Sequence, residues 1–144
     1  MGLGEILRLQ PQPVAAWPWM RPLFSILSTL YIAGIFILPR MISSSLLSKV
    51  WNPYSLLHIP MYGVLIMLLT LTFEPRIFSQ RRGSSGVSFV FLSGGIATAV
   101  GIPDEFHQVF IPYRDAPIGD VMIDIGGIVL TGIFINFDQK RRSK

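Results

Sequence analysis

Long runs without a charged residue dominate this chain. Uncharged runs of 18, 24 and 21 residues occupy positions 22–39, 50–73 and 83–103. A helix needs roughly 20 predominantly apolar residues to cross the hydrocarbon core of a bilayer. A fourth segment is long enough but contains Asp120 and Asp124. We therefore predict an all-α integral membrane bundle with about four spans, near 22–39, 56–73, 87–102 and 118–137.

The composition agrees with lipid as the solvent of this chain. Of its 144 residues, which fit one domain, 51% are hydrophobic and only 14% are charged. Soluble domains carry roughly 25% charged residues, so this chain has too little polar surface to cover itself in water. It has no cysteine, which excludes disulfides, thiolate zinc sites and cysteine nucleophiles.

The basic residues lie mostly between the apolar runs, and the net charge is +4. This pattern fits anionic lipid headgroups, and the absence of a basic stripe speaks against a nucleic-acid partner. With both termini in the cytoplasm, nine basic residues lie inside and three outside, as the positive-inside rule favours. We predict a multi-pass protein of the cell membrane. Its parts are a cytoplasmic N-terminal segment, a transmembrane domain and a basic cytoplasmic tail, at 1–21, 22–137 and 138–144.

Polar residues are concentrated in one 21-residue stretch. Its members are Asp104, Glu105, His107, Gln108, Arg114, Asp115, Asp120 and Asp124. Asp120 and Asp124 are four residues apart, so they share one helix face, as do His58 and Tyr62 in the second span. An ionisable residue at membrane depth is costly and indicates a functional site. Nearby, Gly127 and its neighbour Gly126 would let another helix backbone approach closely.

The segment 104–114 reads Asp-Glu-Phe-His-Gln-Val-Phe-Ile-Pro-Tyr-Arg. It resembles the signature of the VanZ-like family, in which an acidic residue, His and Gln precede a Phe-x-Pro-x-Arg turn. In that family an Asp then opens the last helix, followed by a polar residue four positions later and by glycines. The corresponding residues here are Asp120, Asp124, Gly126 and Gly127, and His58-x-x-x-Tyr62 resembles the earlier motif of the family.

The resemblance spans about 58–132, more than half of the chain. It implies a multi-span membrane protein, and the founding member of the family is linked to resistance to the glycopeptide teicoplanin. The biochemical reaction of the family does not carry over. This chain has Tyr113 where the family often has Gly, which changes the flexibility of the turn, and Asp124 where it often has Asn, which adds a negative charge.

The polar residues allow functional and structural readings. Arg114 would clamp a phosphate or carboxylate through its planar guanidinium, or form an ion pair with one of the carboxylates. His58 would act as an acid–base group, or as a neutral hydrogen-bonding residue between helices. The candidate catalytic residues are His58, Glu105 and Asp120. The candidate substrate contacts are Arg114, Gln108, Asp124 and Tyr62.

Three functions are compatible with these residues. The chain would bind or process an anionic envelope component, such as a lipid-linked phosphate or wall precursor, at the outer leaflet. The second function is that of a small proton-coupled transporter or flippase subunit, and the third is that of a structural membrane partner. We expect a short re-entrant or interfacial segment at 103–117 that caps a polar cavity. A cation held by the carboxylates is a further alternative, but the spacing matches no established metal loop, so we predict neither metal nor cofactor.

Overall fold

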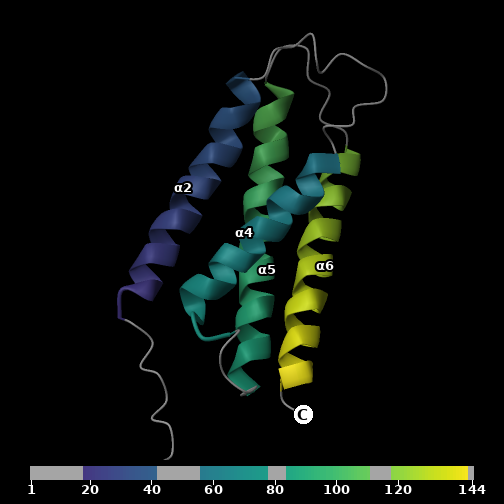
Figure 1. Cartoon of the computed structure of the whole chain (residues 1–144). Helices are drawn as coiled ribbons and strands as arrows, with labels where there is room; N and C mark the ends of the chain where they lie inside the picture. Colours follow the sequence, from purple (N-terminus) through teal and green to yellow (C-terminus); the bar gives the residue numbers. More distant parts are fainter. Residues whose placement is uncertain (1–17, 42–55, 78–83, 111–117, 143–144) are drawn as a thin grey trace, which may run out of the picture.

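The structure is a computed structural model that describes residues 18–41, 56–77, 84–110 and 118–142. These residues form four helices, α2 (Met20–Met41), α4 (His58–Phe73), α5 (Ser84–Val109) and α6 (Ile118–Arg142). Successive helices run in opposite directions, so α2 begins and α6 ends at the same end of the bundle (Figure 1). The prediction of an all-α bundle of four helices is confirmed for the described residues.

Three of the helices are long and apolar enough to cross a bilayer. Their candidate spans are Met20–Ile37, Val87–His107 and Gly119–Arg142. The fourth helix, α4, has 16 residues and is a shorter apolar helix. The length and hydropathy of the other three identify a candidate multi-pass membrane protein.

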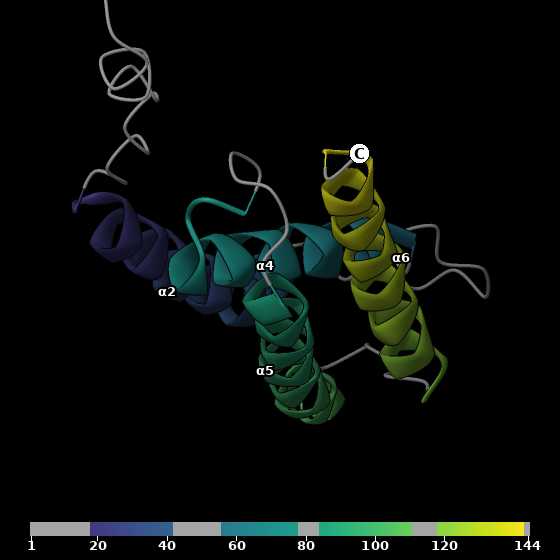
Figure 2. The same ribbon diagram turned by 90° about the horizontal axis from the view of Figure 1, so that it is seen from below.

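The short helix α4 lies at the centre of the bundle. It packs against α2, α5 and α6, and it crosses the other helices obliquely (Figure 2). Its side chains Leu65 and Ile66 are buried, and the Tyr31 hydroxyl of α2 donates a hydrogen bond to the Met61 carbonyl at 3.1 Å. A helix that is apolar on all sides requires neighbours on all sides. The protein itself therefore covers most of α4.

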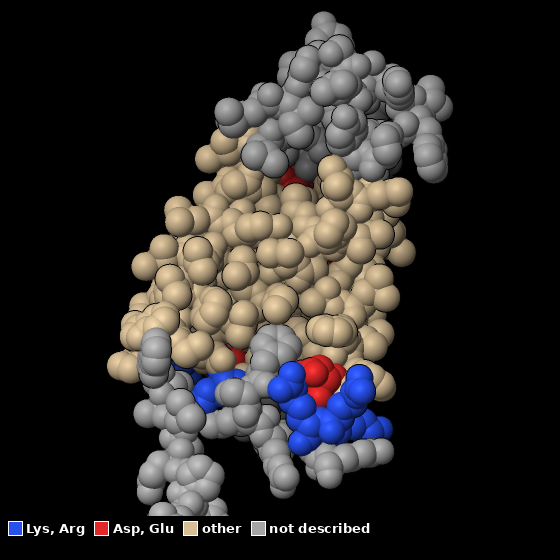
Figure 3. All heavy atoms as spheres, in the orientation of Figure 1, with Lys and Arg blue, Asp and Glu red and all other residues tan. Residues whose placement is uncertain are grey.

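The outer surface of the bundle is apolar along most of its length. On the face seen in Figure 3, a broad uncharged belt ends at a group of basic side chains. The last turn of α6 contributes Lys140, Arg141 and Arg142 to this basic end. Exposed hydrophobic side chains of the belt include Ile26, Leu30, Phe91, Leu130, Ile133 and Phe134. An exposed apolar surface of this extent is typical of contact with a membrane.

One predicted boundary was wrong. We expected a non-spanning segment to begin at 103, but α5 continues through Pro103 to Val109, while 111–117 lies outside the described residues. Proline lacks the amide hydrogen for one backbone bond, but membrane helices tolerate it where the freed carbonyl finds another partner. The helix α6 extends through Arg142, into the segment predicted to be the basic cytoplasmic tail, and Arg142 pairs with Asp138 there at 2.8 Å. The prediction that this tail begins at 138 stays a prediction.

Small residues let α4 and α6 approach closely. A Cβ atom added to Gly127 of α6 would lie 2.9 Å from the Cα of Ile59 in α4. A Cβ added to Gly63 would lie 2.7 Å from the hydroxyl oxygen of Thr131. Beside Gly126, by contrast, nothing lies within 4 Å. The predicted close approach is therefore confirmed at Gly127, and it brings the start of α4 against α6.

Candidate histidine–carboxylate site

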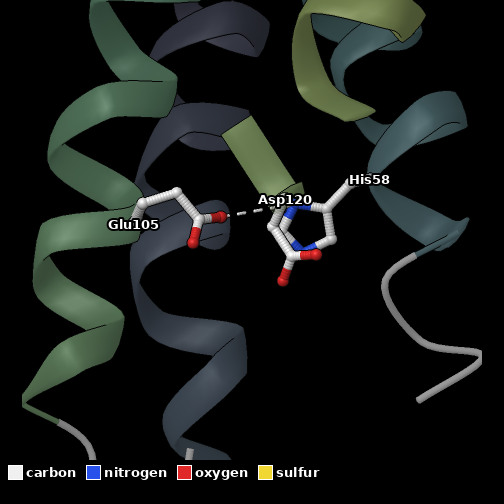
Figure 4. A group of neighbouring side chains, drawn as sticks. All are labelled: His58, Glu105 and Asp120. Carbon is white, nitrogen blue, oxygen red and sulfur yellow. Dashed lines mark ion pairs between the residues drawn. The ribbon is translucent and has the colours of Figure 1, made fainter. Parts of the chain in front are cut away.

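Four buried ionisable side chains from three helices meet at one end of the bundle. His58 is the first residue of α4, Glu105 lies in the last two turns of α5, and Asp120 lies in the first turn of α6. Their side chains point toward one another (Figure 4). Asp124 follows Asp120 by one helical turn and completes what we call the histidine–carboxylate cluster, His58, Glu105, Asp120 and Asp124.

His58 connects the carboxylates of the cluster. Its Nδ1 lies 2.8 Å from Oδ1 of Asp124, which is hydrogen-bond distance, and 3.8 Å from Oε1 of Glu105. One possible ligand atom from each of His58, Glu105 and Asp120 lies within 4.8 Å of the others. The exposed fractions are only 5% for His58, 7% for Glu105 and 2% for Asp124. The cluster is therefore a buried, closely spaced group and not a set of surface charges.

A second hydrogen-bonded pair adjoins the cluster. The Tyr62 hydroxyl donates to Oδ2 of Asp104 at 3.3 Å, and both side chains are fully buried. The Tyr62 ring also stacks against His58, with 6.2 Å between ring centroids. Tyr62 was predicted to contact substrate, and the structure places it between His58 and Asp104, one helical turn after His58 in α4.

Asp104 belonged to the predicted polar stretch but received no role there. Ala97, Gly101 and Asp104 are spaced at i, i+4 and i+7, and all three are buried on one face of α5. A Cβ added to Gly101 would lie 3.2 Å from Oδ2 of Asp124. This spacing assigns Asp104 to the buried face of the helix. The predicted span ended at 102, so Asp104 was not included in the helical spacing pattern.

Several buried carboxylate oxygens of the cluster have no hydrogen-bond partner among the described residues. They are both side-chain oxygens of Glu105 and Oδ2 of Asp124. A buried polar atom without a partner costs on the order of 1–3 kcal/mol, and more when the group is charged. In the described part of the chain, Glu105 and Asp124 each form an ion pair with His58. The cluster therefore holds more acceptors than its own hydrogen bonds satisfy.

The other polar residues of the predicted site are not seen in the cluster. Arg114 lies outside the described residues, and so does the side chain of Gln108, although its backbone belongs to α5. His107 is directed to α2, where its ring meets Phe36 edge-on with 5.8 Å between centroids. The structure thus brings together His58, Tyr62, Glu105, Asp120 and Asp124, and the roles assigned to these residues stay predictions.

The cluster has the chemistry of an acid–base centre. A proton on Nδ1 of His58, donated to Asp124, leaves Nε2 free to accept a proton or bind a ligand. The carboxylate then fixes both the tautomer and the orientation of the ring. Glu105 and Asp120 supply two further groups that take up protons or hold a cation.

Comparison of the chain with known protein families, with curated proteins and with solved structures found no match. The resemblance to the VanZ-like family therefore rests on the motif residues. Five of those residues, His58, Glu105, Asp120, Asp124 and Gly127, lie at the cluster or at the contact between α4 and α6 beside it.

Proposed function

We propose that this chain is a VanZ-like membrane protein that binds or processes an anionic, lipid-linked component of the cell envelope at the outer leaflet. The observation that carries the proposal is the buried histidine–carboxylate cluster, which α4 and the candidate spanning helices α5 and α6 build at one end of the bundle. A polar centre at the end of a membrane bundle meets lipid headgroups first. His58 would transfer the proton, Glu105 and Asp120 would serve as base or charge partner, and Arg114 would hold the anion.

The positions of the basic residues support an orientation with the cluster facing outward. Arg21 lies in the first turn of α2, Arg76 follows α4, and Lys140 to Arg142 end α6, so these residues share the end of the bundle opposite to the cluster (Figure 1). Basic residues are retained on the cytoplasmic side. The cluster then faces outward, which gives access to the outer leaflet and supports a role in the cell envelope, including the glycopeptide response that the resemblance implies.

Single introduced cysteines test this orientation without background labelling, because the chain has no cysteine of its own. Gly119→Cys, at an exposed position at the cluster end, is expected to react with a membrane-impermeant maleimide in intact cells. Arg141→Cys, at the basic end, is expected to react only after the membrane is opened. Gel-shift labelling of the two variants is the measurement, and the reverse pattern would place the cluster on the cytoplasmic side.

The lipid proposal is tested by the lipids that co-purify with the full chain. We expect phosphate-bearing lipids to be several-fold enriched with the native protein, and this enrichment to be lost in His58→Gln and Arg114→Ala. Asp138→Asn, which alters a carboxylate at the opposite end of the bundle, should retain it. Mass spectrometry of matched preparations gives the ratio, and glycopeptide sensitivity of matched cells gives a second readout. Equal lipid profiles in all four proteins would contradict the proposal.

Proton-coupled transport is the second candidate, because protonatable groups adjoin one another at the cluster. Asp104 accepts a hydrogen bond from Tyr62, Tyr62 stacks on His58, and His58 pairs with Asp124. Transport of this kind requires that flux in reconstituted vesicles depend on a pH gradient. A purely structural role instead requires that exchanging the charges of Arg114 and Asp120 restore function, which a substrate-binding centre should not tolerate.

A further inference from the structure

We infer that His58, Glu105 and Asp120 form a binding site for a divalent transition-metal cation such as Mn²⁺ or Zn²⁺. One ligand atom from each residue lies within 4.8 Å of the others, and all three residues are buried. The sequence contains no metal motif because the ligands come from three helices whose residues are far apart in the chain. The inference goes beyond the proposed function, since the site needs no lipid in order to form.

Small side-chain adjustments bring these atoms to bonding geometry. With metal–ligand bonds of about 2.0–2.1 Å, the ligand atoms of a tetrahedral site are roughly 3.4 Å apart. The present upper limit of 4.8 Å therefore requires a closure of about 1.4 Å. The long side chain of Glu105 can supply this movement, because its carboxylate has no hydrogen bond to give up among the described residues.

The unsatisfied oxygens of Glu105 are an independent indication of a ligand. Its side chain is only 8% exposed and points toward His58 and Asp120 (Figure 4), yet neither oxygen has a hydrogen-bond partner among the described residues. A carboxylate in this position has lone pairs directed into the cluster. A cation bound there would satisfy them and would balance the negative charge at the same time.

Asp124 has the geometry of a supporting residue for this site. It accepts a hydrogen bond from Nδ1 of His58 at 2.8 Å when that nitrogen carries the proton. Metal-binding histidines commonly donate their second ring nitrogen to a carboxylate, which fixes the ring and strengthens the metal bond. Asp124 is therefore a positioning residue that holds Nδ1, the nitrogen that lies 3.8 Å from Oε1 of Glu105. Nε2 of His58 is the nitrogen left for the cation, and the Glu105 carboxylate must move from Nδ1 toward the Nε2 side of the ring to share it.

The donor set indicates the class of cation. Calcium and magnesium favour sites built of oxygen ligands, whereas imidazole suits zinc, iron and related transition metals, and carboxylates also suit manganese. One imidazole with two carboxylates fits Mn²⁺, Fe²⁺ or Zn²⁺. If the proposed function holds, His58 would hold the cation in place of transferring a proton, and the cation would let an anionic headgroup approach Glu105 and Asp120 without like-charge repulsion.

Manganese binding to the full-length protein in detergent tests the inference. After removal of metals with a chelator, we expect one Mn²⁺ per chain by electron paramagnetic resonance, with a nitrogen coupling from an imidazole in the pulsed spectrum. Glu105→Gln and Asp120→Asn should weaken binding at least tenfold, and His58→Gln should also abolish the nitrogen coupling. Asp138→Asn, far from the cluster, should bind as the native chain does.

Three results would overturn the inference. They are no Mn²⁺ or Zn²⁺ binding tighter than millimolar, bound Mn²⁺ without nitrogen coupling, or equal affinity in the native chain and in Glu105→Gln. Asp124→Asn gives a further check, because it retains all three ligands and should weaken binding without removing the nitrogen coupling. The experiment contains no lipid substrate, so loss of co-purifying lipid in His58→Gln and loss of metal binding are separate outcomes.

Discussion

Replacing Gly127 with alanine is expected to destabilise the protein by about 3 kcal/mol, the upper part of the range for overpacking a tight contact. The new Cβ would lie 2.9 Å from the Cα of Ile59, and the obstacle is helix backbone, which cannot turn aside as a flexible side chain can. The helices α4 and α6 must separate to accommodate the methyl group. Thermal unfolding in detergent, followed by circular dichroism, measures the loss.

Gly126→Ala is the matched control for this substitution. It adds the same methyl group one residue earlier, where nothing lies within 4 Å. An alanine in a helix is more favourable than a glycine by roughly 0.5–1 kcal/mol, so this variant should be unchanged or slightly more stable. Equal effects of the two substitutions would show that α4 and α6 do not pack as described.

Replacing Glu105 with leucine is expected to stabilise the metal-free protein by about 1–3 kcal/mol. The Glu105 carboxylate is buried and neither of its oxygens accepts a hydrogen bond from a described residue, so its burial carries a cost that leucine avoids. A residue kept at the expense of stability is characteristic of a functional site. Thermal unfolding in the presence of a chelator is the measurement.

Added Mn²⁺ should reverse this order of stability, so that the native chain becomes more stable than Glu105→Leu. The native chain would gain about 2.7 kcal/mol at a cation concentration 100 times the dissociation constant, while Glu105→Leu would gain much less. Asp124→Leu is the contrasting variant, because it removes the hydrogen-bond partner of His58 and should destabilise the protein with or without metal. If Glu105→Leu were as damaging as Asp124→Leu, the carboxylate would be a structural partner and not a ligand.

The helices and the helix faces of the site were predictable from sequence because each depends on local spacing. The uncharged runs required helices, and the four-residue separations of Asp120 from Asp124 and of His58 from Tyr62 placed each pair on one face. The helix contact at Gly127 also followed from residue size. The structure describes all of these residues, and each lies on the buried side expected of it.

The assembly of the cluster was not predictable in the same way. The approach of Glu105 and Asp120 to within bonding reach of His58 depends on the packing of three helices, which leaves no spacing signal in the chain. The predicted third span ended at 102, whereas α5 continues through Pro103, so the prediction left Asp104 off the buried helix face. The structure does not describe Arg114, so its predicted role awaits the substitution experiment.

The short length of α4 has a consequence for how the cluster is reached. A helix of 16 residues extends about 24 Å, whereas the hydrocarbon layer is about 30 Å thick. In a bilayer, the charged residues Glu74 and Arg76, which come just after α4, would hold that end at the level of the headgroups. His58, at the other end, would then lie at least roughly 6 Å beneath the opposite surface of the bilayer, and deeper still because α4 crosses the bundle obliquely. Any headgroup that reaches His58 must enter the bundle and lose its contact with bulk water.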